Sequence, residues 1–376
     1  MPLMHEAATS QLKHQEYHRC PKGHPLNPIS LESWQEGFGF SSSQCYAHPR
    51  RCVICRNEIL PNWVRLGCHM GCDYNVCCSP MCVASALECA KEELGRKPSV
   101  SKCTQVLNEG DSLLVREAAL DALQEIGRGA SPAAAACKKI LLHKGFKDCR
   151  HGSSSTRGNI KSTYGAPDGT VKVLEYASFR TLRLKAAWAL ASMEALYELE
   201  DALKSERPEV VEAATLGILE FARQGDAEIA ASLLPELAGG LSSKSYEVRA
   251  AAAMTIKELA PTEAAAEVVP QLIRTLKERD VTRCENSGAS RKLWQDQTAK
   301  QSFERDIIES LGIVGTPASE AVPLIEARLT DPQSPLKLTA AQTLRQIGAV
   351  CQLEQTLEHS SDQVRWASET ALQRTI

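Results

Sequence analysis

The stretch Val248-Arg249-Ala250-Ala251-Ala252-Ala253-Met254-Thr255-Ile256-Lys257-Glu258-Leu259 decides the fold of this chain, because variants of it recur from about residue 110 onward. Counted from Val248, small residues stand at positions +3 and +4, and apolar residues stand at positions +8 and +11. This spacing predicts a helix with one apolar stripe, whose small residues allow a neighbouring helix to come close.

The same register appears at six other places in the sequence. Close copies start at Val115, Val210, Leu336 and Val364, and looser copies start at Leu182 and Phe303. An apolar segment follows most copies, often after a Gly or Pro that would end the first helix. We therefore predict a mainly α protein, an α-solenoid of about seven helical hairpins in which each motif helix comes first. The copy at Val364 has no following segment, so we expect its apolar face to need a partner or a cap.

The motif also resembles a known family of repeats. Its order of Asp or Pro, then Val-Arg, then paired Ala resembles HEAT repeats, and its shortest spacings resemble the subtype named after phycobilisome lyases. The resemblance covers residues 111–376 and implies a helical solenoid, but it says almost nothing about function. It also implies that Arg116, Arg249 and Arg365 make structural hydrogen bonds between repeats and do not bind anions. Trp188 and Trp366, which lie inside repeat helices, are expected to pack in the core or between repeats and not to be exposed.

Several segments fall outside the repeat pattern. We expect residues 1–19 to be a flexible arm and residues 91–110 to be a linker or cap, with a helix that begins near Ala84 ending there. Residues 145–177 and 280–300 break the repeat spacing and predict two insertions. Long loops of this kind are often functional, so they are candidates for contact with a partner.

Cysteine usage is uneven, with nine of the fifteen cysteines between Cys20 and Cys82. No secretory signal precedes them, so metal binding is favoured over disulfides. Zinc takes four nitrogen or sulfur ligands in a tetrahedron, and two ligands a few residues apart can reach the same ion. Four such pairs predict a module at residues 20–90 that binds two zinc ions: Cys20 and His24, Cys52 and Cys55, Cys68 and Cys72, Cys77 and Cys82.

The segments Cys52-Val-Ile-Cys55 and Cys72-Asp-Tyr-Asn-Val-Cys77 resemble the core of ZZ-type zinc fingers and related C1-like modules. That resemblance implies a cross-braced arrangement. It assigns Cys52, Cys55, Cys77 and Cys82 to one ion, and Cys20, His24, Cys68 and Cys72 to the other. The sequence departs from the family pattern where three residues separate Cys68 from Cys72 and where the last pair is stretched. Cys78 could therefore replace a ligand of the last pair, and Cys45 with His48 could replace Cys20 with His24.

ZZ-type fingers commonly bind the N-terminus of a peptide through acidic side chains. Here Asp73 stands at one acidic position, whereas Asn75 replaces the second acid. The resemblance therefore implies that Asp73 binds a peptide tail, with a purely structural metal module as the open alternative.

The rest of the sequence limits the function classes. The net charge of −3 gives no argument for nucleic acid, no apolar run is long enough for a membrane helix, and no phosphate-binding loop or nucleophile elbow occurs. The only His-Glu pair is His5-Glu6, which excludes the HEAT-like iron hydroxylases. We expect an intracellular protein, cytoplasmic or nuclear, that acts as a non-enzymatic adaptor with a protein partner on the solenoid. A bilin-lyase-like protein and a ubiquitin-pathway or chromatin peptide reader remain the alternatives.

Overall fold

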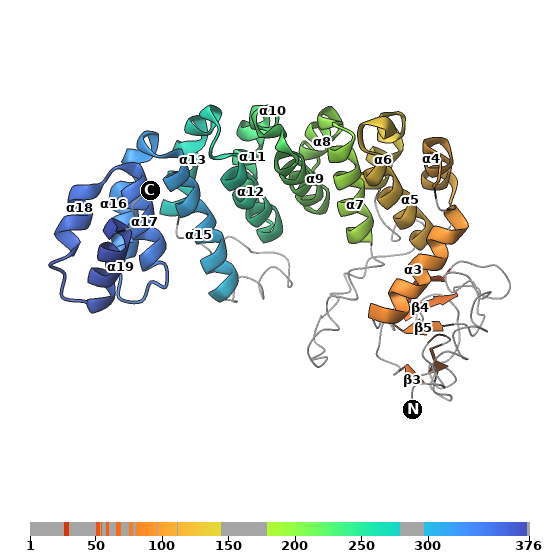
Figure 1. Cartoon of the computed structure of the whole chain (residues 1–376), viewed down its shortest axis with the longest axis horizontal. Coiled ribbons are helices and arrows are strands. Elements are labelled where there is room, and N and C mark those ends of the chain that lie inside the picture. The colour runs from red at the N-terminus through yellow and green to blue at the C-terminus, as the bar shows by residue number, and fades with distance from the viewer. Residues whose placement is uncertain are drawn as a thin grey trace. The chain divides into compact units, whose positions relative to one another are not determined.

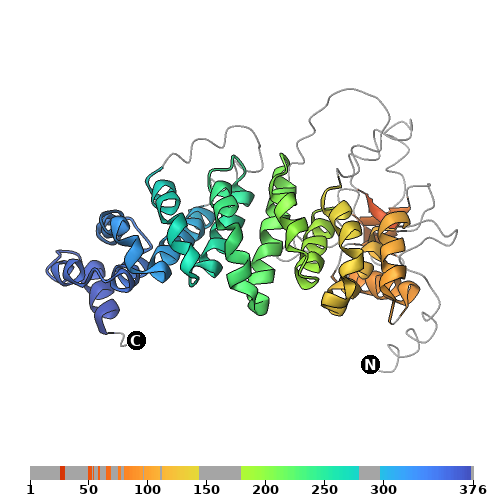
Figure 2. The same ribbon diagram turned by 90° about the horizontal axis from the view of Figure 1, so that it is seen from above.

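A computed structural model describes residues 26–29, 50–52, 54, 58–59, 65–68, 75–77, 80–95, 97–110, 112–143, 179–278 and 297–373. These residues form two compact units. The first unit ends at Ala189 and the second begins at Leu190. Figure 1 shows the helices and strands of both units, and Figure 2 shows them from above.

The first unit starts with short antiparallel strands. A three-stranded sheet has the order β1-β4-β5, with bounds Leu26–Ile29, Arg65–Cys68 and Asn75–Cys77. A separate pair joins β2 (Arg50–Arg51) to β3 (Glu58–Ile59). Strands this short bury little apolar surface and need additional stabilisation from elsewhere in the unit.

Two helices follow the strands. α3 spans Pro80–Leu94 and packs against α5, while α4 spans Val100–Glu109 and packs against α5 and α6. Ser99 caps α4, because its hydroxyl accepts a hydrogen bond from the backbone N–H of Lys102 at 3.2 Å. Residues 91–110, which we expected to be a linker or cap, therefore contain the end of one helix and the whole of another.

Each copy of the sequence motif lies on a helix, and we call these the motif helices. They are α5 (Leu113–Ile126), α7 (Phe179–Ser192), α9 (Pro208–Phe221), α12 (Tyr246–Leu259), α15 (Gln297–Val314), α17 (Lys337–Ile347) and α19 (Asp362–Gln373). In the second unit, α9, α12, α15, α17 and α19 pack in succession. The predicted stripe is the core: Ala251, Ala252, Ile256 and Leu259 of α12 are all buried. A fully buried Ile or Leu stabilises the fold by about 1.5–3 kcal/mol.

Shorter companion helices separate the motif helices. They are η1 with α6 (Gly127–Ala133, Ala134–Leu141), α8 (Leu196–Leu203), α10, η5 and α11 (Ala227–Ala230, Ala231–Leu233, Leu234–Gly240), η6 with α13 (Glu263–Val268, Val269–Lys277), η8 with α16 (Thr316–Ala321, Val322–Thr330) and α18 (Val350–Thr356). A π-helical turn, η4 (Ala222–Asp226), joins α9 to α10, and Gly225 in it takes a φ of 108°.

In each pair of helices, the motif helix and its companion follow one another in the opposite order from the one we predicted. α8 packs against α9, α11 against α12, α16 against α17 and α18 against α19, so the companion precedes its motif helix. The helices η6 and α13 follow α12 in the sequence and pack against each other. α13 also contacts α15, the motif helix that comes next. The expectation that α19 lacks a second helix is therefore wrong, because α18 covers it. The exact number of repeats stays a prediction.

Candidate functional sites

Cys52 and Cys82 place two thiols together in the first unit. Cys52 follows β2, Cys82 lies in the first turn of α3, and both are buried with their Sγ atoms 3.8 Å apart. Two thiolates about 2.3 Å from a tetrahedral zinc ion have sulfurs about 3.8 Å apart. The pair therefore has the spacing of two ligands of one zinc ion, although two neutral thiols in contact would show a similar spacing.

The backbone brings a third predicted ligand to the same elements. Cys77 ends β5, and β5 packs against both β2 and α3. Three of the four residues assigned to one ion, Cys52, Cys77 and Cys82, thus come from elements that contact one another. Cys68, assigned to the other ion, ends β4 opposite Leu26 of β1.

The other predicted site residues lie outside the described residues. These are Cys20, His24, Cys55, Cys72 and Asp73, together with the alternatives Cys45, His48 and Cys78. Within the part of the chain that the structure describes, no group of three His, Cys, Asp or Glu side chains could hold a metal ion. The two zinc ions and their ligand sets therefore stay predictions.

Two further thiols are packing residues. Cys103 of α4 and Cys137 of α6 are fully buried, and burial raises the pKa of Cys103. Burial, reinforced by Cys103, raises the pKa of Cys137 to about 12. A thiol with a raised pKa is a poor nucleophile, because the thiolate is the reactive form.

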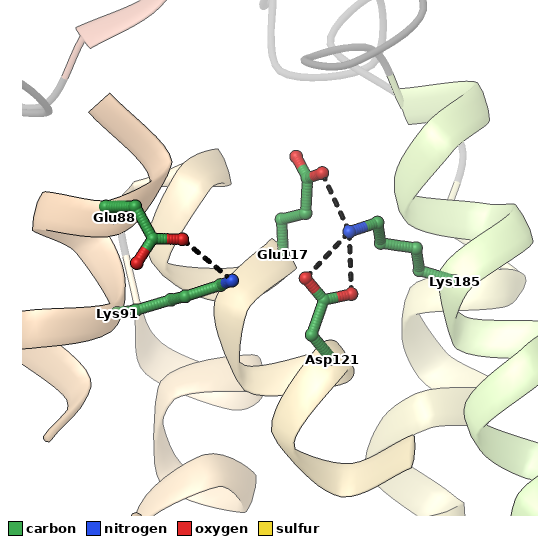
Figure 3. Close-up of polar contacts among 5 residues, drawn as sticks. All are labelled: Glu88, Lys91, Glu117, Asp121 and Lys185. Carbon is green, nitrogen blue, oxygen red and sulfur yellow. Dashed lines mark hydrogen bonds and ion pairs between the residues drawn. The ribbon is translucent and has the colours of Figure 1, made fainter. Parts of the chain in front are cut away.

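A buried ion cluster joins α5 to α7 in the first unit (Figure 3). Lys185 Nζ lies 2.6 Å and 2.8 Å from the two carboxylate oxygens of Asp121 and 3.0 Å from Glu117 Oε1. The contact with Glu117 is an ion pair without hydrogen-bond geometry. On α3, Lys91 pairs with Glu88 at 3.0 Å, but both side chains are exposed, so this pair contributes little.

The cluster shifts the pKa of its members. Burial raises the pKa of Glu117 to about 7, although Lys185 acts in the opposite direction. Burial alone would lower the pKa of Lys185, but Glu117 and Asp121 outweigh burial and raise it. Lys185 thus stays charged while Glu117 titrates near neutral pH, and the cluster ties two helices together across residues 144–178 of the sequence.

The basic residue at position +1 of the motif donates a hydrogen bond to a backbone carbonyl in the segment that precedes its helix. Arg249 Nη1 donates to Ser243 O at 2.5 Å, and Arg365 Nη1 donates to His359 O at 2.7 Å. Both residues therefore make structural hydrogen bonds, but these lie within the turn that leads into their own helix and not between repeats as we expected. We did not predict this role for two further basic residues, Arg183 and Lys337, although both stand at position +1 of their motif copies. Arg183 donates to His143 O at 2.9 Å, and Lys337 donates to Ser334 O at 2.7 Å. Cations beside carbonyls just after a helix also interact favourably with its dipole.

An acidic surface runs over neighbouring companion helices of the second unit. The helices α8, α10, η5, α11 and η6 contain seven acidic residues and no Lys or Arg. We call these residues the acidic ridge: Glu198, Glu200, Asp201, Glu228, Glu236, Glu263 and Glu267. Two large apolar side chains stand exposed among them, Tyr197 at 71% and Ile229 at 56%.

The ridge helices lie close enough for their charges to act together. α11 packs against η6, and η5 also contacts η6. At the end of α8, Lys204 has a raised pKa, first because Glu200 accepts its hydrogen bond and also because Asp201 and Glu236 of α11 are nearby. A cation beside this ridge is therefore stabilised by carboxylates from two companion helices.

The prediction for one tryptophan was wrong. Trp366 of α19 is 57% exposed, so it does not pack in the core. It occupies position +2 of its motif copy, beside the buried stripe, where the helix faces outward. Trp188, at position +6 of α7, is partly buried.

The comparisons with known proteins support a repeat fold. The model of the HEAT repeat matches residues 233–262, which cover α11 and α12. The matched repeat therefore places the motif helix second, as the packing does. No curated protein matches the chain.

Several designed proteins show a distant structural likeness. A designed armadillo repeat protein in complex with peptide (KR)4 is 18% identical with a TM-score of 0.34, over 73% of this chain and 98% of that one. A second designed armadillo repeat protein has 18% identity and a TM-score of 0.33 over 73% and 98% of the chains. An engineered protein from a structural genomics consortium has 16% identity and a TM-score of 0.33 over 73% and 94%. TM-scores this low do not establish a shared fold, so the helical solenoid rests on the helix packing and on the HEAT match.

Among the described residues, no helix is both long enough and apolar enough to span a membrane.

Proposed function

We propose that the helical repeats are a non-enzymatic scaffold that binds a basic segment of a protein partner along the acidic ridge. The observation that carries this proposal is the composition of the ridge helices, in which every charged residue is acidic. Stacked helical repeats are typical of proteins that present an extended surface to another protein. The chemistry of this surface selects a partner rich in Lys and Arg.

The distribution of charge over the second unit supports the ridge as the binding surface. Residues 190–278 and 297–373 contain 26 acidic and 14 basic residues, a net charge of −12. On the motif helices, many carboxylates already have a cation: Arg223 pairs with Glu258 at 3.2 Å, and Lys257 pairs with Asp306 at 3.1 Å and with Glu309. On the ridge, Glu228, Glu236, Glu263 and Glu267 form no ion pair with another described residue.

The exposed apolar residues of the ridge add a second type of contact. Tyr197 lies three and four residues before Glu200 and Asp201 on α8, so these side chains share one face of the helix, and Ile229 lies with Glu228 on the ridge helix α10. An aromatic ring beside carboxylates can receive an Arg or Lys side chain on its face. A segment that alternates basic and apolar residues would therefore satisfy both the carboxylates and the apolar side chains.

The proposal is tested with a fluorescent peptide of alternating Lys and Leu and the full chain, using fluorescence anisotropy at about 0.1 M salt. The variant Glu228→Lys/Glu236→Lys should bind the peptide about tenfold more weakly, because surface charges contribute up to about 1 kcal/mol each. Tyr197→Ala should also weaken binding. Both glutamates and Tyr197 are exposed, so circular dichroism should show an unchanged fold.

The matched control is Glu354→Lys/Glu358→Lys, which makes the same charge change at exposed positions outside the ridge. This control should alter the affinity by no more than about twofold, since salt screens charges beyond about 10 Å. If both variants lost the same amount of affinity for the peptide, the affinity would depend only on the net charge of the chain. That outcome, or no binding by the unmodified chain, would overturn the ridge as the binding surface.

We also propose that residues 20–90 bind two zinc ions, with Cys52, Cys55, Cys77 and Cys82 on one and Cys20, His24, Cys68 and Cys72 on the other. The buried thiols of Cys52 and Cys82, 3.8 Å apart, fit zinc as two ligands of the first ion. Zinc would supply the stabilisation that such short strands cannot supply themselves, and the module would add a second recognition surface. A peptide-binding role for Asp73 and a cytoplasmic or nuclear location stay predictions.

A further inference from the structure

We infer that α3 is a metal-dependent cap on the N-terminal end of the helical repeats, so that metal binding at Cys52 and Cys82 controls how firmly α5 is covered. This inference rests on the zinc site proposed above. It adds that the metal site regulates the helices next to it.

The buried face of α3 carries both the thiol and the contact with the repeats. Cys82, Ala86, Ala90 and Leu94 follow one another at intervals of four residues and are all 0–2% exposed. Residues spaced by four lie on one face of a helix. The stripe that packs toward the helices therefore begins at the thiol.

α3 takes the place of a preceding motif helix for α5. α3 packs against α5 in the first unit, as α12 packs against α15 in the second. On α5, Leu113, Leu114, Val115 and Ala118 are buried. If α3 left, part of this apolar surface would reach water.

The C-terminal end of α3 is held by the helices themselves. Lys102 of α4 donates to the carbonyls of Leu94 and Glu93, the latter at 3.3 Å. The chain then turns at Gly95, whose N–H donates to Lys91 O at 2.9 Å. This end is therefore fixed without any metal.

The N-terminal end depends on the thiols. Two of the four residues in the stripe are alanines, which bury little apolar area, and an isolated helix of 15 residues is marginal in water. Cys82 in the first turn, next to Cys52, is the contact by which a metal would join this end to the strand module. Loss of the metal would thus release α3 from its N-terminal end.

The test is hydrogen exchange of the full chain, measured by mass spectrometry after chelation and again after Zn²⁺ is added back, with the metal content determined in parallel. We expect amides of α3 and α5 to exchange at least about tenfold faster without metal, and zinc to restore their protection. Amides of α17 in the second unit should not change. Cys82→Ser should exchange like the metal-free chain with or without zinc, whereas Cys351→Ser, at an exposed cysteine of α18, should behave like the unmodified chain.

A second variant keeps the test decisive if Cys82→Ser does not fold. Ala90→Gln enlarges a fully buried side chain two turns from Cys82 and leaves every predicted ligand in place. It should bind zinc but gain no protection of α5. If the unmodified chain binds zinc and α5 is protected equally with and without it, the cap is overturned while the zinc proposal stands. If the chain binds no zinc at all, both are overturned.

Discussion

Lys185 shows how a single buried side chain can link two helices through ion pairs. It holds Asp121 at 2.6 Å and Glu117 at 3.0 Å, and its neighbour Arg183 donates to His143 O at 2.9 Å. Both contacts join α7 to helices that precede residues 144–178. A buried charge is costly unless it is paired, so α7 is held in one position relative to α5. The same burial leaves Glu117 with a pKa near 7.

Glu117 should make the stability of the first unit depend on pH. Its pKa is about 7 in the folded chain and 4.5 in the unfolded chain, so the folded state holds more protons between these values. The free energy of unfolding should therefore fall as the pH rises from about 4.5 to about 7, by at most about 3 kcal/mol. In Glu117→Gln this decrease should disappear, as measured by urea unfolding at pH 5 and pH 8. Glu88→Gln, at an exposed position, should keep the decrease, and a Glu117→Gln profile equal to that of the unmodified chain would contradict the assignment.

At the scale of the elements, position +7 of the motif sets how closely neighbouring motif helices approach. This position holds Gly217 in α9, Thr255 in α12, Ser310 in α15, Thr343 in α17 and Ala371 in α19, which are all small. Thr255 Oγ1 lies 3.2 Å from Thr215 O of α9 and 2.8 Å from Ala251 O of its own helix, and Thr343 Oγ1 donates to Ile308 O of α15 at 3.2 Å. On the neighbouring helix Thr215 and Ile308 both stand at position +5, so one contact between helices recurs in the same register.

Thr255→Val and Thr343→Val should each lower the free energy of unfolding of the second unit by about 1 kcal/mol, because each removes a buried hydroxyl that contacts a backbone carbonyl of the neighbouring motif helix. Valine has nearly the same shape, so the loss reports the hydroxyl. Thr330→Val is the matched control, since Thr330 Oγ1 donates only within its own helix, to Glu326 O at 3.0 Å. Urea unfolding followed by circular dichroism would measure all three. A loss for Thr330→Val as large as for the other two would argue against a tether between helices.

Over the whole molecule, charge is distributed very unequally along the chain. The net charge is −3, yet the described residues of the second unit carry −12, so the remaining residues carry +9. The net charge of the whole chain therefore does not reveal that the second unit is strongly acidic. Such asymmetry favours association with basic partners and makes that association sensitive to salt.

Binding of the Lys-Leu peptide should weaken steeply as the salt concentration rises from 50 mM to 500 mM, because the Debye length falls from roughly 14 Å to roughly 4 Å over this range. Anisotropy titrations at several salt concentrations would measure the slope. The slope should be shallower for Glu228→Lys/Glu236→Lys, which has fewer carboxylates on the ridge. An affinity that does not respond to salt would show that apolar contacts with Tyr197 and Ile229 dominate instead.

The repeat pattern alone was enough to predict the motif helices and their buried faces. Small residues at +3 and +4 with apolar residues at +8 and +11 suffice for this, because periodicity is local information. The stripe of α12 is buried as predicted, whereas Arg249 and Arg365 make structural hydrogen bonds within the turn before their own helix and not between repeats. The cluster of cysteines also predicts Cys52 and Cys82 as metal ligands, and their Sγ atoms lie 3.8 Å apart.

Which helices pair could be read only from the folded chain, because a helix between two motif helices has the same periodicity whichever neighbour it packs against. Trp366 was misplaced because its exposure depends on which face the neighbouring helices cover. The sequence also missed α4 altogether, since Val100–Glu109 lies outside the repeat pattern and we expected a linker or cap there. The contact of Lys185 with Asp121 spans 64 residues, and the thiols of Cys52 and Cys82 meet across 30. Interactions between residues so far apart in the chain leave no periodic trace, so only the folded chain brings them together.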